Sequence, residues 1–318
     1  MMTEENQTSV KEIFLLGFKV LYNFKIPYFL LFLVLYTMTL TGNLMIVTLV
    51  TVSPNLRHPM FFFLSHLSLT DIILTTNIVP NMLCIILNGG KIMSLQACIV
   101  QLQFFGLSLG TECLLLTVMS YDRYLAICSP LHYTTIMSNK LRPQLAVSCW
   151  LLGFIISFIT VILVSQLHFC GSNIIDHFFC DLLPFLQLSC SDTFIVRLEN
   201  ILLGTPITLF PAIIITITYV CIFMAILKIP STSGRQKTFS TCSSHLAVVI
   251  TFYGTLVTLY VIPSSGHSLN ANKVLSLIYT VGTPLFNPII YSLRNKEIRV
   301  AFKRYIYLIN IEKRHQCM

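Results

Sequence analysis

Seven long apolar stretches constrain the fold of this 318-residue chain more than any other feature. They lie near residues 26–50, 59–84, 97–125, 144–166, 197–227, 239–262 and 272–293. Each can cross the hydrocarbon core of a bilayer, which takes about 20 residues of helix. Backbone groups in lipid must be hydrogen-bonded within the segment, so helices are expected, and these stretches do not alternate as the strands of a membrane barrel do. The sequence therefore predicts an all-α membrane protein with a seven-transmembrane helix bundle.

The charged residues agree with this prediction and orient the chain. Only 10% of the residues are charged, whereas a soluble domain carries about 25%. Of the 20 Lys and Arg, fourteen fall on one side of the seven stretches, and the positive-inside rule makes that side cytoplasmic. The N-terminus is then extracellular, and so is the glycosylation sequon at Asn6. Basic residues that flank membrane segments form no continuous groove, so no nucleic acid is expected as a partner.

This topology predicts three parts: an extracellular segment at 1–25, a seven-transmembrane domain at 26–293 and a cytoplasmic tail at 294–318. The N-terminal segment lacks the basic start and apolar core of a cleavable signal peptide. The tail interleaves basic and aromatic residues, which predicts a short amphipathic helix on anionic membrane lipid. These residues are Arg299, Phe302, Lys303, Arg304 and Tyr305.

Four of the eleven cysteines fall on the outside, where disulfides form: Cys98, Cys170, Cys180 and Cys190. Four cysteines allow three pairings, and the sequence alone does not choose among them. A zinc site that includes His168 and His177 is the alternative. Residues 171–192 are too polar to span the membrane and combine aromatic with ionisable side chains, which predicts an ordered lid over a pocket.

Two carboxylates lie within the apolar stretches, where an ionisable side chain is costly unless it is paired or solvated. Asp71 sits midway along the second stretch, and Glu112 lies about three turns before Arg123 on the third. If both face the interior they can share a sodium ion or a proton, because close like charges cannot both stay bare. Asn43 and Asn287 can complete this polar core. The alternative is an ion pathway through a transporter, for which the fourth and sixth stretches offer almost no charge.

Two motifs lie at the inner ends of the third and seventh stretches. The third ends in Met119-Ser-Tyr-Asp-Arg-Tyr-Leu-Ala-Ile-Cys-Ser-Pro130, which places an adjacent acid and base at the membrane surface. The seventh ends in Pro284-Leu-Phe-Asn-Pro-Ile-Ile-Tyr-Ser-Leu-Arg-Asn295, where a proline kinks the helix. These strings resemble the signatures of rhodopsin-like (class A) G-protein-coupled receptors, and their longer forms resemble those of olfactory receptors.

The resemblance to olfactory receptors covers nearly the whole chain. Similar strings follow in the same order at residues 56–71, 130–133, 237–246 and 252–254. Four positions depart from the usual residue of the family: Phe61, Ser120, Thr218 and Thr238. These small changes leave Asp122, Arg123 and Asn287 intact, so they affect tuning rather than coupling.

The resemblance implies an odorant receptor of the plasma membrane, not an enzyme, that activates a heterotrimeric G protein of the stimulatory olfactory type and raises cyclic AMP. It implies the disulfides Cys98–Cys180 and Cys170–Cys190, and it assigns a candidate sodium site, with no other cofactor, to Asp71 and Glu112. Activation would free Arg123 from Asp122. Coupling and switching fall to Asp122, Arg123, Tyr124, Tyr219, Asn287, Pro288 and Tyr291.

The ligand cavity is then expected between the third, fifth, sixth and seventh helices, below the 171–192 loop. Side chains three to four residues apart share one face of a helix, and on this basis we expect these residues to line the cavity: Phe105, Gly106, Leu109, Leu203, Gly204, Ile207, Tyr253, Leu256, Val257, Tyr260 and Thr280. Such a cavity is mostly apolar, with hydroxyls at Tyr260 and Thr280 and no strong charge. It suits a small, weakly polar, volatile molecule.

Two other function classes fit less well. A transporter would show internal repeats or helices broken at matching places, and the stretches lack that symmetry. A membrane enzyme needs catalytic groups at one depth, whereas His66, His132 and His245 lie at the cytoplasmic ends of different helices without a metal-ligand pattern. Ser243 and Ser244, beside His245, are interpreted as polar residues at the start of the sixth helix.

Overall fold

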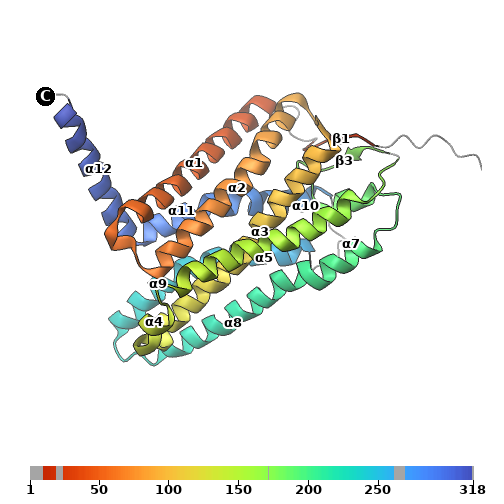
Figure 1. The fold of residues 1–318 in the computed structure, drawn as a ribbon. Helices are drawn as coiled ribbons and strands as arrows, with labels where there is room; N and C mark the ends of the chain where they lie inside the picture. The colour runs from red at the N-terminus through yellow and green to blue at the C-terminus, as the bar shows by residue number, and fades with distance from the viewer. Residues whose placement is uncertain (1–9, 19–23, 171, 261–268, 317–318) are drawn as a thin grey trace, which may run out of the picture.

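The computed structural model describes residues 10–18, 24–170, 172–260 and 269–316, and long helices packed side by side make up most of it (Figure 1). The membrane-spanning helices are α1 (Lys25–Val52), α2 (Pro59–Asn88), α3 (Leu95–Cys128), α5 (Leu141–Ser165), the continuous α7, η3 and α8 (Phe194–Glu199, Asn200–Gly204, Thr205–Leu227), α9 (Thr232–Tyr260), and α10, η4 and α11 (Leu269–Leu277, Ile278–Gly282, Thr283–Arg294). Six are long and apolar enough to cross a membrane, and α9 contains a shorter apolar part at Cys242–Thr258. The predicted seven-helix bundle is confirmed.

The helix ends follow local chemistry rather than hydropathy alone. Gly89 ends α2 with a φ of 74°, a left-handed conformation that glycine adopts without strain. Ser94 begins α3, and its side chain accepts a hydrogen bond from the backbone nitrogen of Ala97. At the inner side, α9 starts at Thr232 instead of the predicted residue 239. Its first turns are polar and extend beyond the apolar core, so an apolar window cannot find them.

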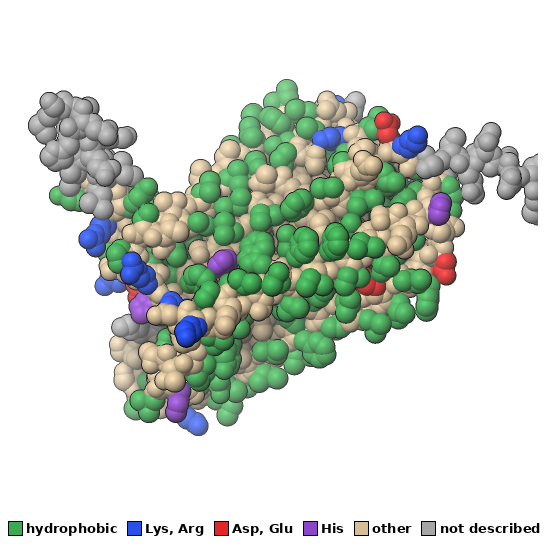
Figure 2. All heavy atoms as spheres, viewed as in Figure 1, with side chains coloured by type: hydrophobic (Ala, Val, Ile, Leu, Met, Phe, Trp, Pro, Cys, Tyr) green, Lys and Arg blue, Asp and Glu red, His purple; other side chains and the backbone are tan. Residues whose placement is uncertain are grey.

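Polarity is distributed as a bilayer requires. Figure 2 shows apolar side chains over the middle of the bundle, and basic side chains gathered mostly at the end that carries α4 (Pro130–Ile136) and the start of α12 (Lys296–Gln316). Large apolar side chains such as Phe210 and Ile250 are more than 60% exposed, while Asp71 and Glu112 are fully buried. The apolar outer surface, with Asp71 and Glu112 inside the bundle, differs from the pattern of a soluble protein.

Short elements close the two ends of the bundle. At the inner end, η2 (Pro54–Leu56) joins α1 to α2, and α12 runs away from the bundle (Figure 1). The tail helix is 21 residues long, so it is longer than the short helix expected from the sequence. At the outer end lie α6 (Leu182–Gln187) and a three-stranded sheet of order β2-β1-β3.

The sheet includes the N-terminal segment, which the sequence pattern did not reveal. β1 (Glu12–Leu15) pairs antiparallel with β2 (Lys91–Ser94) and parallel with β3 (Ile174–Ile175). Ile13 and Leu15 are fully buried beneath it. A four-residue strand is too short for its alternation to stand out in sequence. The N-terminal segment therefore helps to cover the outer end of the bundle.

Candidate functional site

A cavity of about 250 Å³ lies in the outer half of the bundle. Its walls come from α3, α5, η3, α8 and α9, and residues 181–183 of the outer loop close it. The lining residues are Leu102, Phe105, Gly106, Leu109, Gly110, Cys113, Gly153, Ile156, Ser157, Thr160, Asp181, Leu182, Leu183, Asn200, Gly204, Thr205, Ile207, Thr208, Leu209, Ala212, Tyr253, Leu256 and Val257. The wall is thus apolar with a few polar groups, as is usual for a small-molecule site.

Eight of the eleven positions proposed from the sequence line this cavity: Phe105, Gly106, Leu109, Gly204, Ile207, Tyr253, Leu256 and Val257. The proposal was wrong for two others. Leu203 is 36% exposed and does not line the cavity. Thr280 is fully buried, and its hydroxyl donates to the carbonyl of Ser276. The side chain of Tyr260 lies outside the described part of the structure.

Both misplaced residues lie in π-helical segments. Leu203 belongs to η3 and Thr280 to η4. A π turn closes its hydrogen bonds between residues i and i+5, so it changes the helical spacing locally, although Gly204 and Ile207 still line the cavity. No sequence motif marks these turns, which explains why the α-helical pattern failed there.

The helices around the cavity also differ from the prediction. α5, the fourth spanning helix, lines the cavity, whereas no described residue of the seventh does. Gly153 explains the first difference, since a Cβ there would lie 2.6 Å from Oγ1 of Thr111, so α5 packs closely on α3. The Phe105 ring contacts the buried Tyr279 with centroids 5.9 Å apart, and this aromatic pair fills the space toward the seventh helix.

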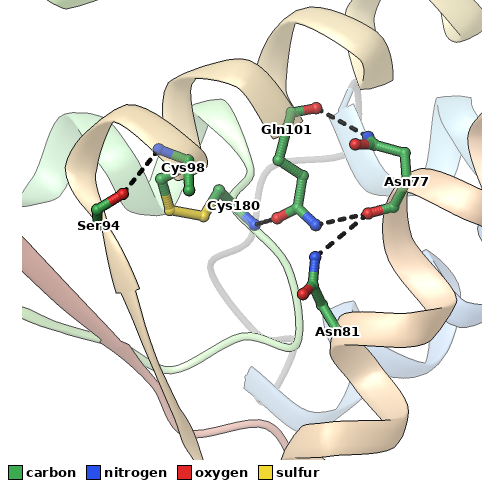
Figure 3. The surroundings of a disulfide bond; sticks show 7 residues. Asn77, Asn81, Ser94, Cys98, Gln101 and Cys180 are labelled. Carbon is green, nitrogen blue, oxygen red and sulfur yellow. Dashed lines mark hydrogen bonds between the residues drawn. A yellow bond between two sulfur atoms is a disulfide. The ribbon is translucent and has the colours of Figure 1, made fainter.

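A lid fixed to α2 and α3 covers the outer end of the cavity. Cys98 on α3 is bonded to Cys180, with their Cα atoms 5.5 Å apart (Figure 3). The Gln101 side chain accepts from the backbone nitrogen of Cys180 at 2.9 Å and donates to the carbonyl of Asn77 at 2.9 Å (Figure 3). The ring of Phe179 packs on Phe105. The lid is therefore anchored by one covalent bond and a buried polar network.

A second disulfide joins Cys170 to Cys190, with a Cα separation of 5.9 Å. Both pairings are those that the family resemblance implies. Because all four outer cysteines are in disulfides, they offer no thiolates to a metal, and the zinc alternative is wrong for the described residues. His177 is instead buried between aromatic rings, 4.8 Å from Phe178 and 4.6 Å from Phe179 between centroids.

A buried charge contacts the lid. Lys273 on α10 is only 2% exposed, and its ammonium donates to the Gly17 carbonyl at 2.8 Å and to Asp176 at 2.6 Å. Burial, and then the nearby Lys273 charge, lower the pKa of His177 to about 3, so this imidazole is neutral at physiological pH. No sequence pattern indicates this contact of Lys273 with the N-terminal segment.

A polar centre lies below the cavity. Asn287 on α11 donates to Asp71 on α2 at 2.9 Å, and Asn43 on α1 donates to the Pro284 carbonyl at 3.0 Å. Buried oxygens of the centre without a hydrogen-bond partner among the described residues are Asp71 Oδ1, Glu112 Oε1 and Oε2, Asn43 Oδ1, Asn287 Oδ1 and Ser108 Oγ. Unpartnered oxygens at one depth fit a hard cation such as sodium, which takes oxygen ligands.

At the inner end, the acid and base of the third helix are held by different partners. Asp122 is buried and accepts a hydrogen bond from the Tyr133 hydroxyl of α4 at 2.8 Å. Burial, and then the Asp122 charge, raise the pKa of Tyr133, so its hydroxyl stays protonated and donates. The structure contains no ion pair between Asp122 and Arg123 within its described residues. In this conformation there is thus no ion pair for Arg123 to leave, and its movement on activation stays a prediction.

Of the other switch residues, Tyr219 contacts His245. Its Nδ1 lies 2.6 Å from the Tyr219 hydroxyl of α8, and it is fully buried within α9 rather than at a helix start. The interpretation of His245 as part of a cytoplasmic helix end was wrong, because α9 begins more than three turns earlier. Tyr291 is also buried, and its hydroxyl has no partner among the described residues.

Two further predicted switch residues have packing partners. The ring of Tyr124 stacks on Tyr121 with centroids 6.3 Å apart. Pro288 lies against Gly42 of α1, where an added Cβ would be 3.0 Å from the proline ring. The predicted glycosylation site Asn6 lies outside the described residues.

Comparison with known proteins decides the family. The family model for olfactory receptors matches residues 32–308. The chain belongs to the olfactory receptor family. It is 48% identical to olfactory receptor 5G3 of Homo sapiens, over 96% of this chain and 97% of that protein. It is 46% identical to olfactory receptor 5G29 of Mus musculus, over 99% and 98% of the two chains.

Membership in this family settles several expectations. This olfactory receptor is a multi-pass plasma membrane protein of the G-protein-coupled class, and its relatives are receptors rather than enzymes. The transporter and enzyme alternatives are set aside on the same ground. Three polar residues near the cavity and lid were missed from sequence: Gln101, Thr160 and Glu199. Glu199 could have been noticed as a carboxylate at the start of the fifth apolar stretch.

Proposed function

We propose that this receptor binds a small odorant in the 250 Å³ cavity and thereby activates a G protein of the stimulatory olfactory type, raising cyclic AMP. A ligand shifts such an equilibrium only if it binds the active arrangement more tightly than the resting one. The cavity must therefore contact an element that also reaches the G-protein face.

The observation that supports this proposal is the position of Tyr253 on α9. Its ring lines the cavity, and its hydroxyl donates to the Cys113 carbonyl of α3 at 3.1 Å. Two turns closer to the cytoplasm, the same helix carries His245, which holds Tyr219 of α8. A ligand that displaces Tyr253 would thus act on the helix that positions the inner switch.

The inner halves of α8 and α9 leave room for such a movement. An apolar space of about 500 Å³ lies between them, and it extends from Tyr253 to Phe239. Arg123 lies beside this region, and its Nε is buried without a hydrogen-bond partner in the described structure. We propose that α9 swings outward on agonist binding and that Arg123 then faces the G protein.

Two accessory roles belong to the same proposal. Asp71 and Glu112 would hold a sodium ion that stabilises one of the two arrangements. The basic face of α12, with Arg299, Lys303 and Arg304, would lie on anionic lipid, since Ile298 and Ala301 on its other face are buried.

Cyclic AMP in cells that carry the receptor and an olfactory G protein tests the proposal, with a broad odorant panel and surface labelling. A dose-dependent rise that disappears in Arg123→Ala at equal surface expression is expected. An unchanged response in Arg123→Ala would reject the coupling role.

A further inference from the structure

The hydroxyl groups that line the described cavity have all used their single hydrogen within the protein. Three of them donate to backbone carbonyls at 2.8–3.1 Å: Ser157 to Phe154, Thr205 to Asn200 and Thr208 to Gly204. Tyr253 donates to the Cys113 carbonyl. Because a carbonyl can only accept, the direction of each bond is fixed. The Ser157 oxygen also accepts from Nε2 of Gln103 at 2.9 Å. Toward a ligand these four groups can offer only lone pairs, so they act as acceptors.

The fifth hydroxyl, that of Thr160, has two acceptors within hydrogen-bond distance, the Ile156 carbonyl at 3.1 Å and the Glu199 carboxylate. Its Oγ1 lies 2.9 Å from Oε1 of Glu199, a side chain that is only 8% exposed. The second oxygen, Oε2, is buried and has no hydrogen-bond partner among the described residues. Asn200, the next residue, lines the cavity. Glu199 itself is not a lining residue, so Thr160 is the group of this pair that meets a ligand, and it does so through its lone pairs.

The other lining residues also offer more hydrogen-bond acceptors than donors. No Lys, Arg or His is among the described lining residues, while the carboxylate of Asp181 is. Asn200 is the one described lining side chain with N–H groups, and its Oδ1 lies against Gly204, where an added Cβ would be only 2.5 Å away. The cavity thus holds more acceptors than donors.

We propose that this cavity selects odorants that carry an O–H or N–H donor, such as alcohols and amines, over molecules of the same shape that only accept. Thr160 accepts the hydrogen bond from this donor, and Glu199 is a positioning residue that accepts from the Thr160 hydroxyl. The inference rests on the proposed function of the cavity and adds the chemical class of its ligand. A carbonyl or ether oxygen beside Thr160 would face acceptors and leave its lone pairs unmatched, which is how polar sites reject analogues.

The test uses purified full-length receptor and probes matched in heavy atoms. Hexanol, octanol and phenylethanol are each compared with the corresponding amine, the aldehyde, and a methyl ether (methyl pentyl, methyl heptyl and benzyl methyl ether). Thermal unfolding is followed at increasing probe concentration. We expect the alcohol or amine of at least one skeleton to stabilise the receptor at about tenfold lower concentration than its ether, the effect of one hydrogen bond. Equal stabilisation by donor and ether, or none by any donor probe, overturns the inference.

Variants locate the donor contact. Thr160→Val and Glu199→Gln should each reduce the alcohol-to-ether ratio to near unity, whereas Thr160→Ser, which keeps the hydroxyl, should preserve it. Thr48→Val is the matched control, because the Thr48 hydroxyl lies within hydrogen-bond distance of the Leu44 carbonyl four residues earlier, as that of Thr160 does of the Ile156 carbonyl. An unchanged alcohol-to-ether ratio in both Thr160→Val and Glu199→Gln would show that the preference for donors arises at other residues. It would reject the role proposed for Thr160 and Glu199.

Signalling separates this inference from the proposed function. Donor-selective stabilisation without any cyclic AMP response would contradict the receptor mechanism and leave the ligand class intact. A cyclic AMP response to ethers and alcohols at equal potency would support the receptor mechanism and contradict the inferred ligand class.

Discussion

The ammonium of Lys273 lies 2.6 Å from Asp176 and 2.8 Å from the Gly17 carbonyl, so one buried side chain joins α10, the lid and the N-terminal segment. The two charges of this pair are unequally buried, at 2% exposure for the lysine and 32% for the aspartate side chain. Because of this difference in burial, replacing Lys273 and replacing Asp176 should lower the stability of the receptor by different amounts.

Asp176→Asn should destabilise the receptor more than Lys273→Met does. Removing the carboxylate leaves a buried ammonium without a counter-charge, which costs about 2 kcal/mol after allowance for the partial exposure of Asp176. Removing the lysine leaves a carboxylate that water already reaches. Thermal unfolding midpoints of the two purified variants check the order. The same midpoint for both, or the reverse order, would show that Lys273 is not a buried charge.

The lid should lose stability as the pH falls below about 6.5, where an unfolded histidine gains a proton. The folded pKa of His177 is held near 3 by burial and by Lys273, with Asp176 acting in the opposite sense. Because the folded pKa is depressed, the unfolded state binds more protons between these values, and stability declines by up to about 1.4 kcal/mol per pH unit. Hydrogen exchange of residues 174–180 at pH 7 and pH 5 measures this, and His177→Phe should flatten the dependence. An equally steep dependence in His177→Phe would assign it to another group.

Sodium should stabilise the receptor through the polar centre. Asp71 Oδ1 and both oxygens of Glu112 are buried without partners in the described structure, so a bound cation would relieve unpaired acceptors. We expect the thermal midpoint to be higher in sodium chloride than in choline chloride. Asp71→Asn and Glu112→Gln should remove that difference. If both variants keep the full sodium effect, the ion binds elsewhere.

Two glycines should respond in opposite ways to alanine. A Cβ at Gly153 would lie 2.6 Å from Oγ1 and 3.0 Å from the backbone nitrogen of Thr111, so Gly153→Ala must push α5 away from α3, at a cost of about 1–3 kcal/mol. A Cβ at Gly254 meets nothing within 4 Å, and alanine in a helix interior is favoured by about 1 kcal/mol. Unfolding midpoints should therefore fall for Gly153→Ala and rise for Gly254→Ala. A tolerated Gly153→Ala would contradict the close packing of α3 on α5.

Hydropathy and charge predict the coarse architecture well because the bilayer imposes both. Helix number, orientation and the buried position of Asp71 follow from the cost of polar groups in lipid. The disulfide pairs came from the family resemblance, since four cysteines alone leave three pairings open.

The site was predicted less completely, for local reasons. Leu203 and Thr280 lie in π turns, which carry no sequence signal. The part played by α5 depends on how closely Gly153 lets two helices approach, and the strand at Glu12–Leu15 forms only because β2 and β3 lie beside it. Tertiary contacts of this kind cannot be deduced from helical spacing.

The most direct test of the account is the response to one agonist when the cavity is filled. Ile207→Trp puts a large ring into the cavity, and Ile213→Trp on the same helix places it on a surface that is 55% exposed. At equal surface expression, the agonist concentration for half-maximal cyclic AMP should rise at least about tenfold in Ile207→Trp, the penalty for overpacking, and stay unchanged in Ile213→Trp. An unaltered dose response in Ile207→Trp would contradict the claim that this cavity receives the odorant.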